Sequence, residues 1–443
     1  MENTHQTNSQ PSGFLDRNRT IIKGFLIGFL ILLMFIPTTL IQNLVQEREQ
    51  RQHEVINEIS SKWATSQTIV GPLLVVPYKE YTKDNNGKVL EARRNVYLLP
   101  DQLLVNGNVL PEVRNRSLYD VTLYRSVLHL SGSFNPESLK ALQLAEASFV
   151  WSEAKLLLGI DDARGLEEEA SLNWNEQYYL LDAGVPENSV VAHGLSTTVS
   201  FDSTTQVKFS FQLKLKGSEN LYFTPVGRST GIVLRSSWKH PAFDGQYLPV
   251  SHKISDSGFH AAWKVLQVSR NYPQAWMSGQ YELKKSAFGV RLIQPTDNYA
   301  KTERSVKYAI LFIALTFTVF FFLEVLQKRQ VHPLQYILVG FSLCIFYSLL
   351  LSISEYTGFN PAYLIAATAT VLLIGLYVRS IFKQGKVAMI FTSALSGLYT
   401  YIFVLIQLQD YALLFGSIGL FLIIAVLMYF SKKIDWYNTT RGN

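Results

Sequence analysis

The chain has 443 residues and one cysteine, and its formal net charge at neutral pH is +6. This length indicates two or three structural units rather than one. Residues 42–300 hold 26 Lys and Arg against 27 Asp and Glu, so the positive excess lies in the other residues, which flank long apolar runs. The charge is therefore a membrane-flanking feature, and no nucleic-acid partner is expected.

The N-terminal segment predicts a tail followed by a membrane anchor. Residues 1–20 are expected to be a disordered cytoplasmic tail, because the first dozen are polar. Residues 21–41 (IIKGFLIGFLILLMFIPTTLI) are apolar and have the length that a helix needs to cross a bilayer. A cleaved signal peptide is the alternative, but no A-x-A site follows the apolar stretch.

Residues 42–66 are predicted to continue the anchor as an amphipathic stalk helix. Apolar residues recur there at helical spacing, at Val55, Ile56, Ile59 and Trp63. The stalk would connect the anchor to the region that follows.

Residues 67–300 are predicted to form a large, mainly β domain that resembles a sandwich. Short runs rich in β-branched and aromatic residues are separated by Gly, Pro and Asn, and VKFSFQLKLKG (207–217) alternates strictly. Residues 136–148 are expected to add a helix. The only cysteine, Cys344, lies outside this region. The domain therefore folds without disulfides, as a core of this size allows.

The last third of the chain predicts a compact bundle of five membrane spans over residues 301–430. Each apolar run is close to the roughly 20 residues that a spanning helix needs. The predicted spans are 306–326, 334–354, 362–381, 387–408 and 411–430. Residues 431–443 would form a cytoplasmic tail.

The distribution of cations predicts the orientation of the six spans. Arg17, Arg19 and Lys23 precede the first span, which places the N-terminus in the cytoplasm. Residues 42–305 are then outside. The turn at Lys328–Arg329 is inside, and the later short loops follow the same alternation. The C-terminus is therefore also expected in the cytoplasm.

One basic cluster lies on the outer side, against this rule. Lys301, Arg304 and Lys307 are three residues apart and would share one helix face. The structural interpretation is a helix that enters the membrane with its cations extended to the headgroups. The functional interpretation is a binding site for anionic lipid.

The stretch SSWKHPAFDGQYLP (236–249) raises the question of a hydrolase site. Ser236, His240 and Asp244 are the residue types of a catalytic triad. Triad members usually come from separate loops, however, and no G-x-S-x-G pattern is present. No catalytic residue is therefore predicted.

The same stretch is better explained as a structural motif. Trp238 and Phe243 would be buried by packing, and Phe243-Asp244-Gly245 is typical of a turn. Asp244 would cap this turn, and His240 would hold it in place.

Asp162 and Arg164 form a second candidate site, beside Asp161. Two adjacent carboxylates are a weak signal for a divalent cation. The arginine two residues later favours an internal ion pair within a turn. The histidines of the chain form neither H-x-H nor H-E-x-x-H, so no metal or cofactor is expected.

Charged residues near the span ends bear on a transport function. Glu324 and Arg379 lie near inner ends, whereas Glu355 and Asp410 lie near outer ends. A transporter is expected to place such groups at mid-depth, and none of these is there. Glu355, in the short EYTGFNP turn, is the candidate binding residue, and it would dock on the outer domain or contact headgroups.

Five stretches are long enough to be compared with known families. They are RSLYDVTLYRSVLHLSG (116–132), TPVGRSTGIVLRSSWKHPAFDGQYLP (224–249), GFHAAWKVLQVSRNYPQAW (258–276), 288–317 and 332–367. In these stretches the chain resembles the CreD proteins, bacterial inner-membrane proteins of cell envelope integrity, from about residue 44 to residue 430. The resemblance implies a bacterial inner (cytoplasmic) membrane location and a link to envelope stress. The family has no agreed catalytic residues, so the resemblance implies none here.

The leading hypothesis is a non-enzymatic inner-membrane protein that supports cell envelope integrity. It would bind an envelope component through its periplasmic domain. Membrane lipids are the expected partners, and another envelope protein is a further candidate. One alternative is a transporter or lipid-handling protein that uses the C-terminal bundle, and a second is a periplasmic hydrolase.

Overall fold

A computed structural model describes residues 19–83, 89–186, 190–277, 281–294, 298–408 and 411–432. Most of the predicted tails, 1–20 and 431–443, lies outside these residues. The chain divides into two compact units. Residues Gln52–Pro295 form the first, called here the β domain. Met1–Arg51 and Thr296–Asn443 form the second, called here the helical unit.

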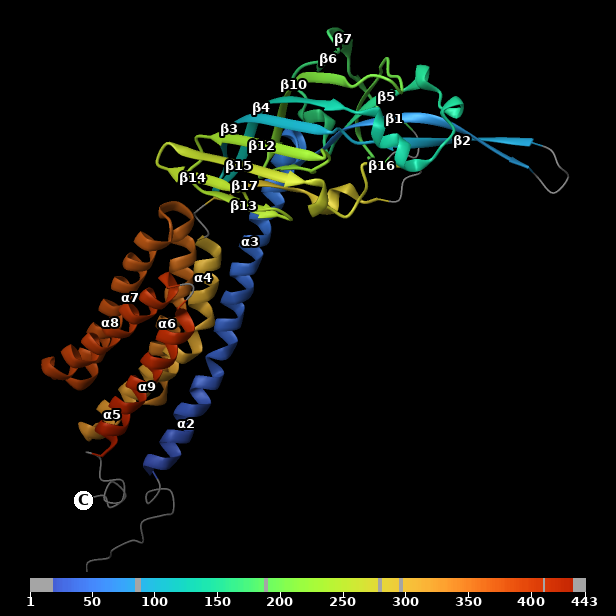
Figure 1. Cartoon of the computed structure of the whole chain (residues 1–443). Coiled ribbons are helices and arrows are strands. Elements are labelled where there is room, and N and C mark those ends of the chain that lie inside the picture. Colours follow the sequence, from blue (N-terminus) through green and yellow to red (C-terminus); the bar gives the residue numbers. More distant parts are fainter. Residues whose placement is uncertain are drawn as a thin grey trace, which may run out of the picture. The chain divides into compact units, whose positions relative to one another are not determined.

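The described residues contain eight α-helices, labelled in Figure 1. They are α2 (Arg19–Leu33), α3 (Phe35–Trp63), α4 (Asn298–Lys307), α5 (Ala309–Leu326), α6 (Pro333–Thr357), α7 (Phe359–Phe382), α8 (Gly385–Gln407) and α9 (Ala412–Ser431). Six helical segments are long and apolar enough to cross a membrane. The predicted fold class, six membrane helices with a large mainly β domain, is confirmed.

The first of these segments runs from Ile22 to Trp63 and is interrupted only at Met34. Pro37 explains the interruption, because it has no N–H to donate to the carbonyl of Leu33 one turn earlier. The helical path is kept, since Met34 N donates to Leu30 O at 3.0 Å and Thr38 N donates to Met34 O at 3.3 Å. The residues predicted as anchor and stalk therefore belong to one helical segment.

Aromatic side chains fill the centre of the helical unit. The Tyr399 ring contacts Phe312 at 4.5 Å and Phe346 at 4.8 Å between centroids, both edge to face. The Tyr363 hydroxyl donates to the Tyr399 carbonyl at 2.8 Å. A pocket between α5 and α8 holds only about 20 Å³, which is room for about one water.

The β domain contains two mixed sheets in its described residues. The nine-stranded sheet has the order β13-β17-β11-β1-β5-β9-β8, with β2 on β1 and β16 on β2. Its strands are β1 (Gln67–Lys83), β2 (Val89–Leu98), β5 (Lys155–Ile160), β8 (Asp182–Ala183), β9 (Gly194–Thr198), β11 (Asn220–Phe223), β13 (Pro241–Gly245), β16 (Ala275–Met277) and β17 (Phe288–Leu292).

The eight-stranded sheet has the order β14-β15-β12-β3-β4-β10-β6-β7. Its strands are β3 (Gln102–Arg116), β4 (Tyr119–Phe134), β6 (Ser171–Trp174), β7 (Gln177–Leu180), β10 (Val207–Ser218), β12 (Ser229–Ser236), β14 (Ser251–Ser255) and β15 (Gly258–Leu266). Burial alternates along β3 and along β10, as the sequence of 207–217 predicts.

One hydrophobic core is filled from both sheets. It includes Leu73 and Leu157 from the nine-stranded sheet and Leu130 and Leu213 from the eight-stranded sheet. Each sheet therefore buries one face against this core and leaves other positions exposed.

The helix expected over 136–148 is not an α-helix. The chain forms two 3₁₀-helices there, η1 (Pro136–Leu142) and η2 (Glu146–Ser148). Gln143 adopts a left-handed conformation (φ 52°), which ends η1 after seven residues. The remaining 3₁₀-helices are η3 (Trp151–Glu153), η4 (Ala163–Gly165), η5 (Gln267–Ser269) and η6 (Leu283–Ser286).

Candidate functional site

The turn expected at residues 243–245 is instead part of an edge strand. Residues Pro241–Gly245 form β13, which pairs with β17 along its whole length. The turn prediction was wrong because Asp-Gly is typical of turns, whereas here Gly245 closes the strand with φ 95°. Trp238 and Phe243 are half-buried against the core. The Trp238 indole donates to the carbonyls of His240 and Ile293, both at 3.1 Å.

The contacts of Ser236 and Asp244 do not form a catalytic triad. The Ser236 hydroxyl accepts from the Trp238 backbone N–H at 3.2 Å. Asp244 accepts from the Tyr222 hydroxyl and lies 3.5 Å from Arg291. Burial and the Asp244 carboxylate raise the pKa of Tyr222 well above its usual value. These pairings connect strands of the sheet, which is a structural role.

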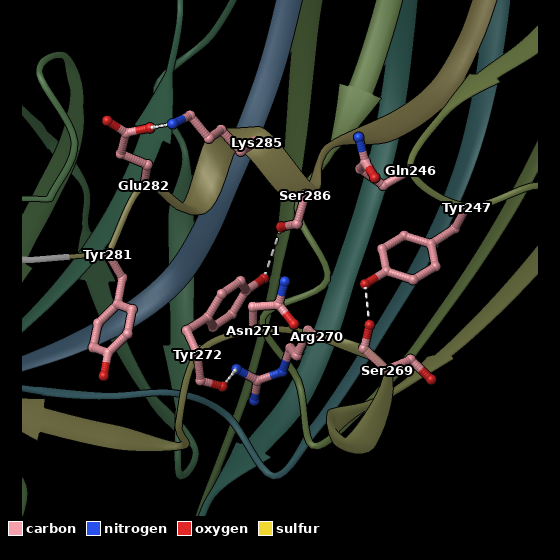
Figure 2. Close-up of a pocket in the computed structure, with 10 residues that line it drawn as sticks. All are labelled: Gln246, Tyr247, Ser269, Arg270, Asn271, Tyr272, Tyr281, Glu282, Lys285 and Ser286. Carbon is pink, nitrogen blue, oxygen red and sulfur yellow. Dashed lines mark hydrogen bonds and ion pairs between the residues drawn. The ribbon is translucent and has the colours of Figure 1, made fainter.

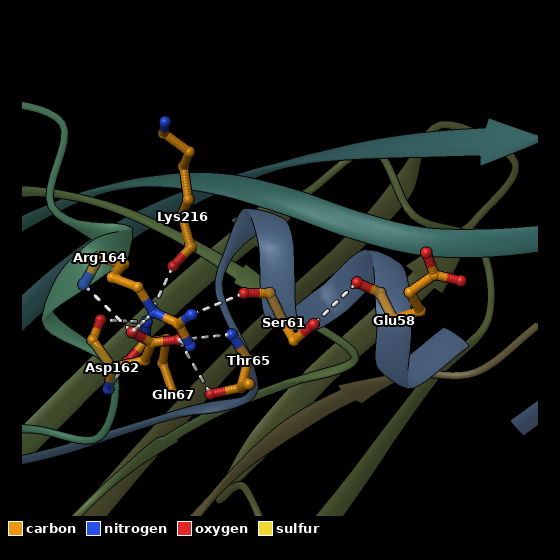
Figure 3. Close-up of polar contacts among 7 residues, drawn as sticks. All are labelled: Glu58, Ser61, Thr65, Gln67, Asp162, Arg164 and Lys216. Carbon is orange, nitrogen blue, oxygen red and sulfur yellow. Dashed lines mark hydrogen bonds and ion pairs between the residues drawn. The ribbon is translucent and has the colours of Figure 1, made fainter. Parts of the chain in front are cut away.

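Asp162 and Arg164 form the expected ion pair, and it is bidentate (Figure 3). Arg164 donates Nε–H to Oδ1 at 2.9 Å and Nη2–H to Oδ2 at 2.8 Å. Asp162 is buried, and the backbone N–H of Thr65 also donates to it at 3.0 Å. The Arg164 pair and these N–H donors lower the pKa of Asp162 to about 2.

The same network connects the end of α3 to the sheets. Arg164 Nη1–H donates to the Ser61 carbonyl in the last turn of α3, at 2.7 Å. The Gln67 side chain donates to the carbonyls of Asp162 (2.9 Å) and Lys216 (3.1 Å), as Figure 3 shows. All acceptors of Asp162 are therefore used within the fold, which leaves no open coordination for a cation.

Glu355 is held inside the helical unit. Its side chain is 9% exposed, the Tyr299 hydroxyl donates to it at 2.9 Å, and Arg48 lies at 4.0 Å. Asn298 fixes the same turn by accepting from the Phe359 N–H at 3.0 Å. These contacts connect the beginning of α4 to the α6–α7 turn, so Glu355 is a structural residue of this unit.

The cluster Lys301, Arg304 and Lys307 lies on α4, and its members have different surroundings. Lys307 pairs with Glu303 at 3.2 Å, and the Lys301 ammonium lies 5.8 Å from the Phe359 ring centroid. Within the described ranges, Arg304 has no ion pair and is half-buried. Arg304 is therefore the member of the cluster that remains available to an anion.

A buried charge network at the inner ends of the spans was missed by the sequence analysis. Glu324 is 5% exposed and forms an ion pair with Lys23. The Tyr336 hydroxyl and the Val331 N–H also donate to it, both at 2.8 Å. The network joins α2, α5 and α6. The sequence signal was a carboxylate inside an apolar run, together with a lysine inside another.

The exposed side of the eight-stranded sheet carries a basic face, defined here as Arg235, Lys253, His260 and Lys264. In the strand register, Lys253 on β14 lies opposite His260 on β15, and His260 lies opposite Arg235 on β12. The alternating residues of β15, such as Trp263, face the core, so His260 and Lys264 point away from it.

The basic face carries unbalanced positive charge. All four side chains are exposed, and no carboxylate of the described chain forms an ion pair with them. Leu104 and Leu266 are also exposed on this side, at 52% and 45%. Cations beside exposed leucines are typical of surfaces that contact a membrane interface.

The fold defines the class as a multi-pass membrane protein with one large β-rich domain. The family model described as "Inner membrane protein CreD" matches residues 19–437. A protein of Escherichia coli (strain K12), named "Inner membrane protein CreD", is 33% identical over 416 residues. The match covers 92% of this chain and 91% of that protein. The chain therefore belongs to the CreD family of inner membrane proteins, and the resemblance seen in the sequence is confirmed.

Proposed function

We propose that the β domain lies in the periplasm and that both termini lie in the cytoplasm. The cations that flank the spans support this orientation, because Lys and Arg near span ends favour the cytoplasm. Residues 42–305 would then be periplasmic.

The protein would support envelope integrity by binding another envelope component, without catalysis. The observation that carries this proposal is the basic face, where Arg235, Lys253 and Lys264 are exposed without carboxylate partners among the described residues. An anionic lipid surface attracts such cations by about 1 kcal/mol each.

Lipid is favoured over a protein partner by the leucines of this face. Leu104 on β3 and Lys264 on β15 lie in register on either side of Gly231 in β12, the strand between them. A bilayer interface accommodates the cations at its headgroups and the leucines at its apolar edge. Arg304 of the helical unit is proposed as a second headgroup contact, in line with the lipid-binding interpretation of its cluster.

Capture of lipid vesicles tests the proposal. The full chain would be placed in phosphatidylcholine nanodiscs, immobilised, and exposed to vesicles with or without phosphatidylglycerol. We expect capture of the anionic vesicles only, and a loss at high salt because screening weakens exposed charges. The variant R235Q/K253Q/K264Q should reduce capture about tenfold or more.

A matched control removes three cations that already have carboxylate partners. The variant K79Q/R93Q/K140Q neutralises cations that pair with Glu91, Glu153 and Glu137. It should capture anionic vesicles like the unchanged protein. Equal capture by both triple variants, or equal capture of neutral vesicles, would contradict lipid binding by the basic face.

A further inference from the structure

A pocket of about 470 Å³ opens in the β domain, and none of the four residues of the basic face lines it. Figure 2 shows Tyr281 and Tyr247 on opposite sides of it, with Arg270, Asn271 and Tyr272 between them. This volume is within the range of small-molecule sites, which combine apolar walls with a few polar groups.

Arg270 is the unusual member of this pocket, because it is a buried cation without an anionic partner. Its side chain is 7% exposed, and no carboxylate in the described residues pairs with it. Burial lowers the pKa of Arg270 to about 10, so the guanidinium remains charged at neutral pH. A buried charge without a counter-charge is unfavourable, and native proteins rarely keep one.

The hydrogen bonds of Arg270 leave donors unused. Nη1 donates to the carbonyls of Tyr272 (2.9 Å) and Pro273 (3.3 Å), and Nη2 donates to the Gln274 side chain. A guanidinium has five N–H donors. The Nε–H has no partner in the described part of the chain, and its nitrogen is buried from solvent. Nη2 keeps one further hydrogen.

The charges at the rim nearly cancel. Lys285 and Glu282 form an ion pair, and both are exposed. The pocket therefore carries a net charge of about one positive unit, from Arg270. This charge matches a monoanion rather than a phosphate dianion.

We propose that this pocket binds a small organic molecule through one carboxylate, which accepts hydrogen bonds from the unused donors of Arg270. A planar carboxylate fits the planar guanidinium fork, whereas a lysine would offer only a point charge. The tyrosines at the two sides would pack on the body of the ligand, and the amide of Asn271 would bond to its polar groups. This site is independent of lipid binding by the basic face.

The proposal is tested with the full chain in detergent and with matched probes. Glucuronate and glucose share a sugar ring and differ in the carboxylate, N-acetylalanine carries a carboxylate on a peptide-like body, and glycerophosphoglycerol carries a lipid-like phosphodiester. Ligand-observed NMR would give the Kd of each. We expect glucuronate or N-acetylalanine to bind and glucose not to bind. Whichever carboxylate has the lower Kd identifies the natural ligand as sugar-like or peptide-like.

Variants then place the carboxylate at Arg270. R270K keeps the charge and loses the fork, so we expect the Kd to rise about tenfold. R93K makes the same change at an exposed arginine outside the pocket and should leave the Kd unchanged. The two exposed rim residues should change the Kd in opposite directions, because a cation attracts the anionic ligand and a carboxylate repels it. K285Q should raise the Kd about threefold, and E282Q should lower it about threefold.

The rim variants keep the proposal testable if R270K fails to fold. Four outcomes would overturn it: no carboxylate binds, glucose binds as well as glucuronate, glycerophosphoglycerol binds best, or neither rim variant changes the Kd. Vesicle capture by the basic face is measured separately, so a failure of either proposal leaves the other one interpretable.

Discussion

The helical unit and the β domain each bury a charged side chain, and the two side chains differ in the partners that surround them. In the helical unit, Glu324 forms an ion pair with Lys23 and accepts hydrogen bonds from the Tyr336 hydroxyl and the Val331 N–H. In the β domain, Arg270 donates only to neutral acceptors among the described residues, and its Nε–H has no partner there. A buried charge with all its partners is a structural link, whereas one that lacks its counter-charge is a candidate for a ligand.

Asp162 shows that this difference does not come from the kind of unit. It lies in the β domain, as Arg270 does, yet Arg164 and Thr65 satisfy it fully. The partners of a buried charge therefore decide whether it stabilises the fold or is open to a ligand.

The largest effect is expected at Glu324. The variant E324A leaves Lys23 and the Tyr336 hydroxyl without their acceptor, and breaking a buried ion pair costs about 3 kcal/mol or more. We expect much less folded protein in the membrane and a lower thermal midpoint of the helical circular dichroism signal.

The matched control for this variant is E303A, which makes the same substitution in a pair whose lysine, Lys307, is exposed. Its effect should stay below about 1 kcal/mol, as is usual for surface pairs. If E303A and E324A have equal midpoints, the buried network does not stabilise the helical unit.

A smaller effect, with a defined pH dependence, is expected at Asp162. Its pKa is about 2 in the folded domain, below the reference value of 3.8. The stabilisation is therefore fully present above about pH 4 and is lost as the pH falls towards 2. It amounts to about 2 kcal/mol. The difference in unfolding midpoint between the unchanged protein and D162N should shrink over this range.

Tryptophan fluorescence is the suitable measurement for this prediction, since six of the seven tryptophans lie between residues 63 and 276. The variant R164A keeps the carboxylate and removes its main partner, which raises the folded pKa of Asp162 towards the reference value. The loss of stability on acidification should therefore be smaller and should end at a higher pH. A midpoint difference that is constant from pH 5 to pH 2 would show that Asp162 is not stabilised by this network.

The sequence predicted those parts of the fold that depend on composition and period. Long apolar runs predicted the six membrane helices, and the alternation in 207–217 predicted a strand that buries one face. The ion pair of Asp162 with Arg164 was predictable because its members are two residues apart. These signals are local, so one sequence is enough to read them.

The remaining features depend on residues far apart in the chain. Lys23 and Glu324 are 301 positions apart, and only the packing of α2 on α5 brings them together. The strand at Pro241–Gly245 forms because β17 lies beside it, which overrides the turn preference of Asp-Gly. That Arg270 has no carboxylate partner within the described ranges can be seen only from the three-dimensional placement of those residues.

The most direct test of the proposed function combines the basic face with the envelope itself. R235Q/K253Q/K264Q and the control K79Q/R93Q/K140Q would each replace the native protein in cells that lack it. Protein level in the membrane and sensitivity to detergent would be measured together. We predict that both variants reach the normal level and that only R235Q/K253Q/K264Q leaves the cells sensitive. A normal barrier with R235Q/K253Q/K264Q at full level would contradict the proposal that this face supports the envelope.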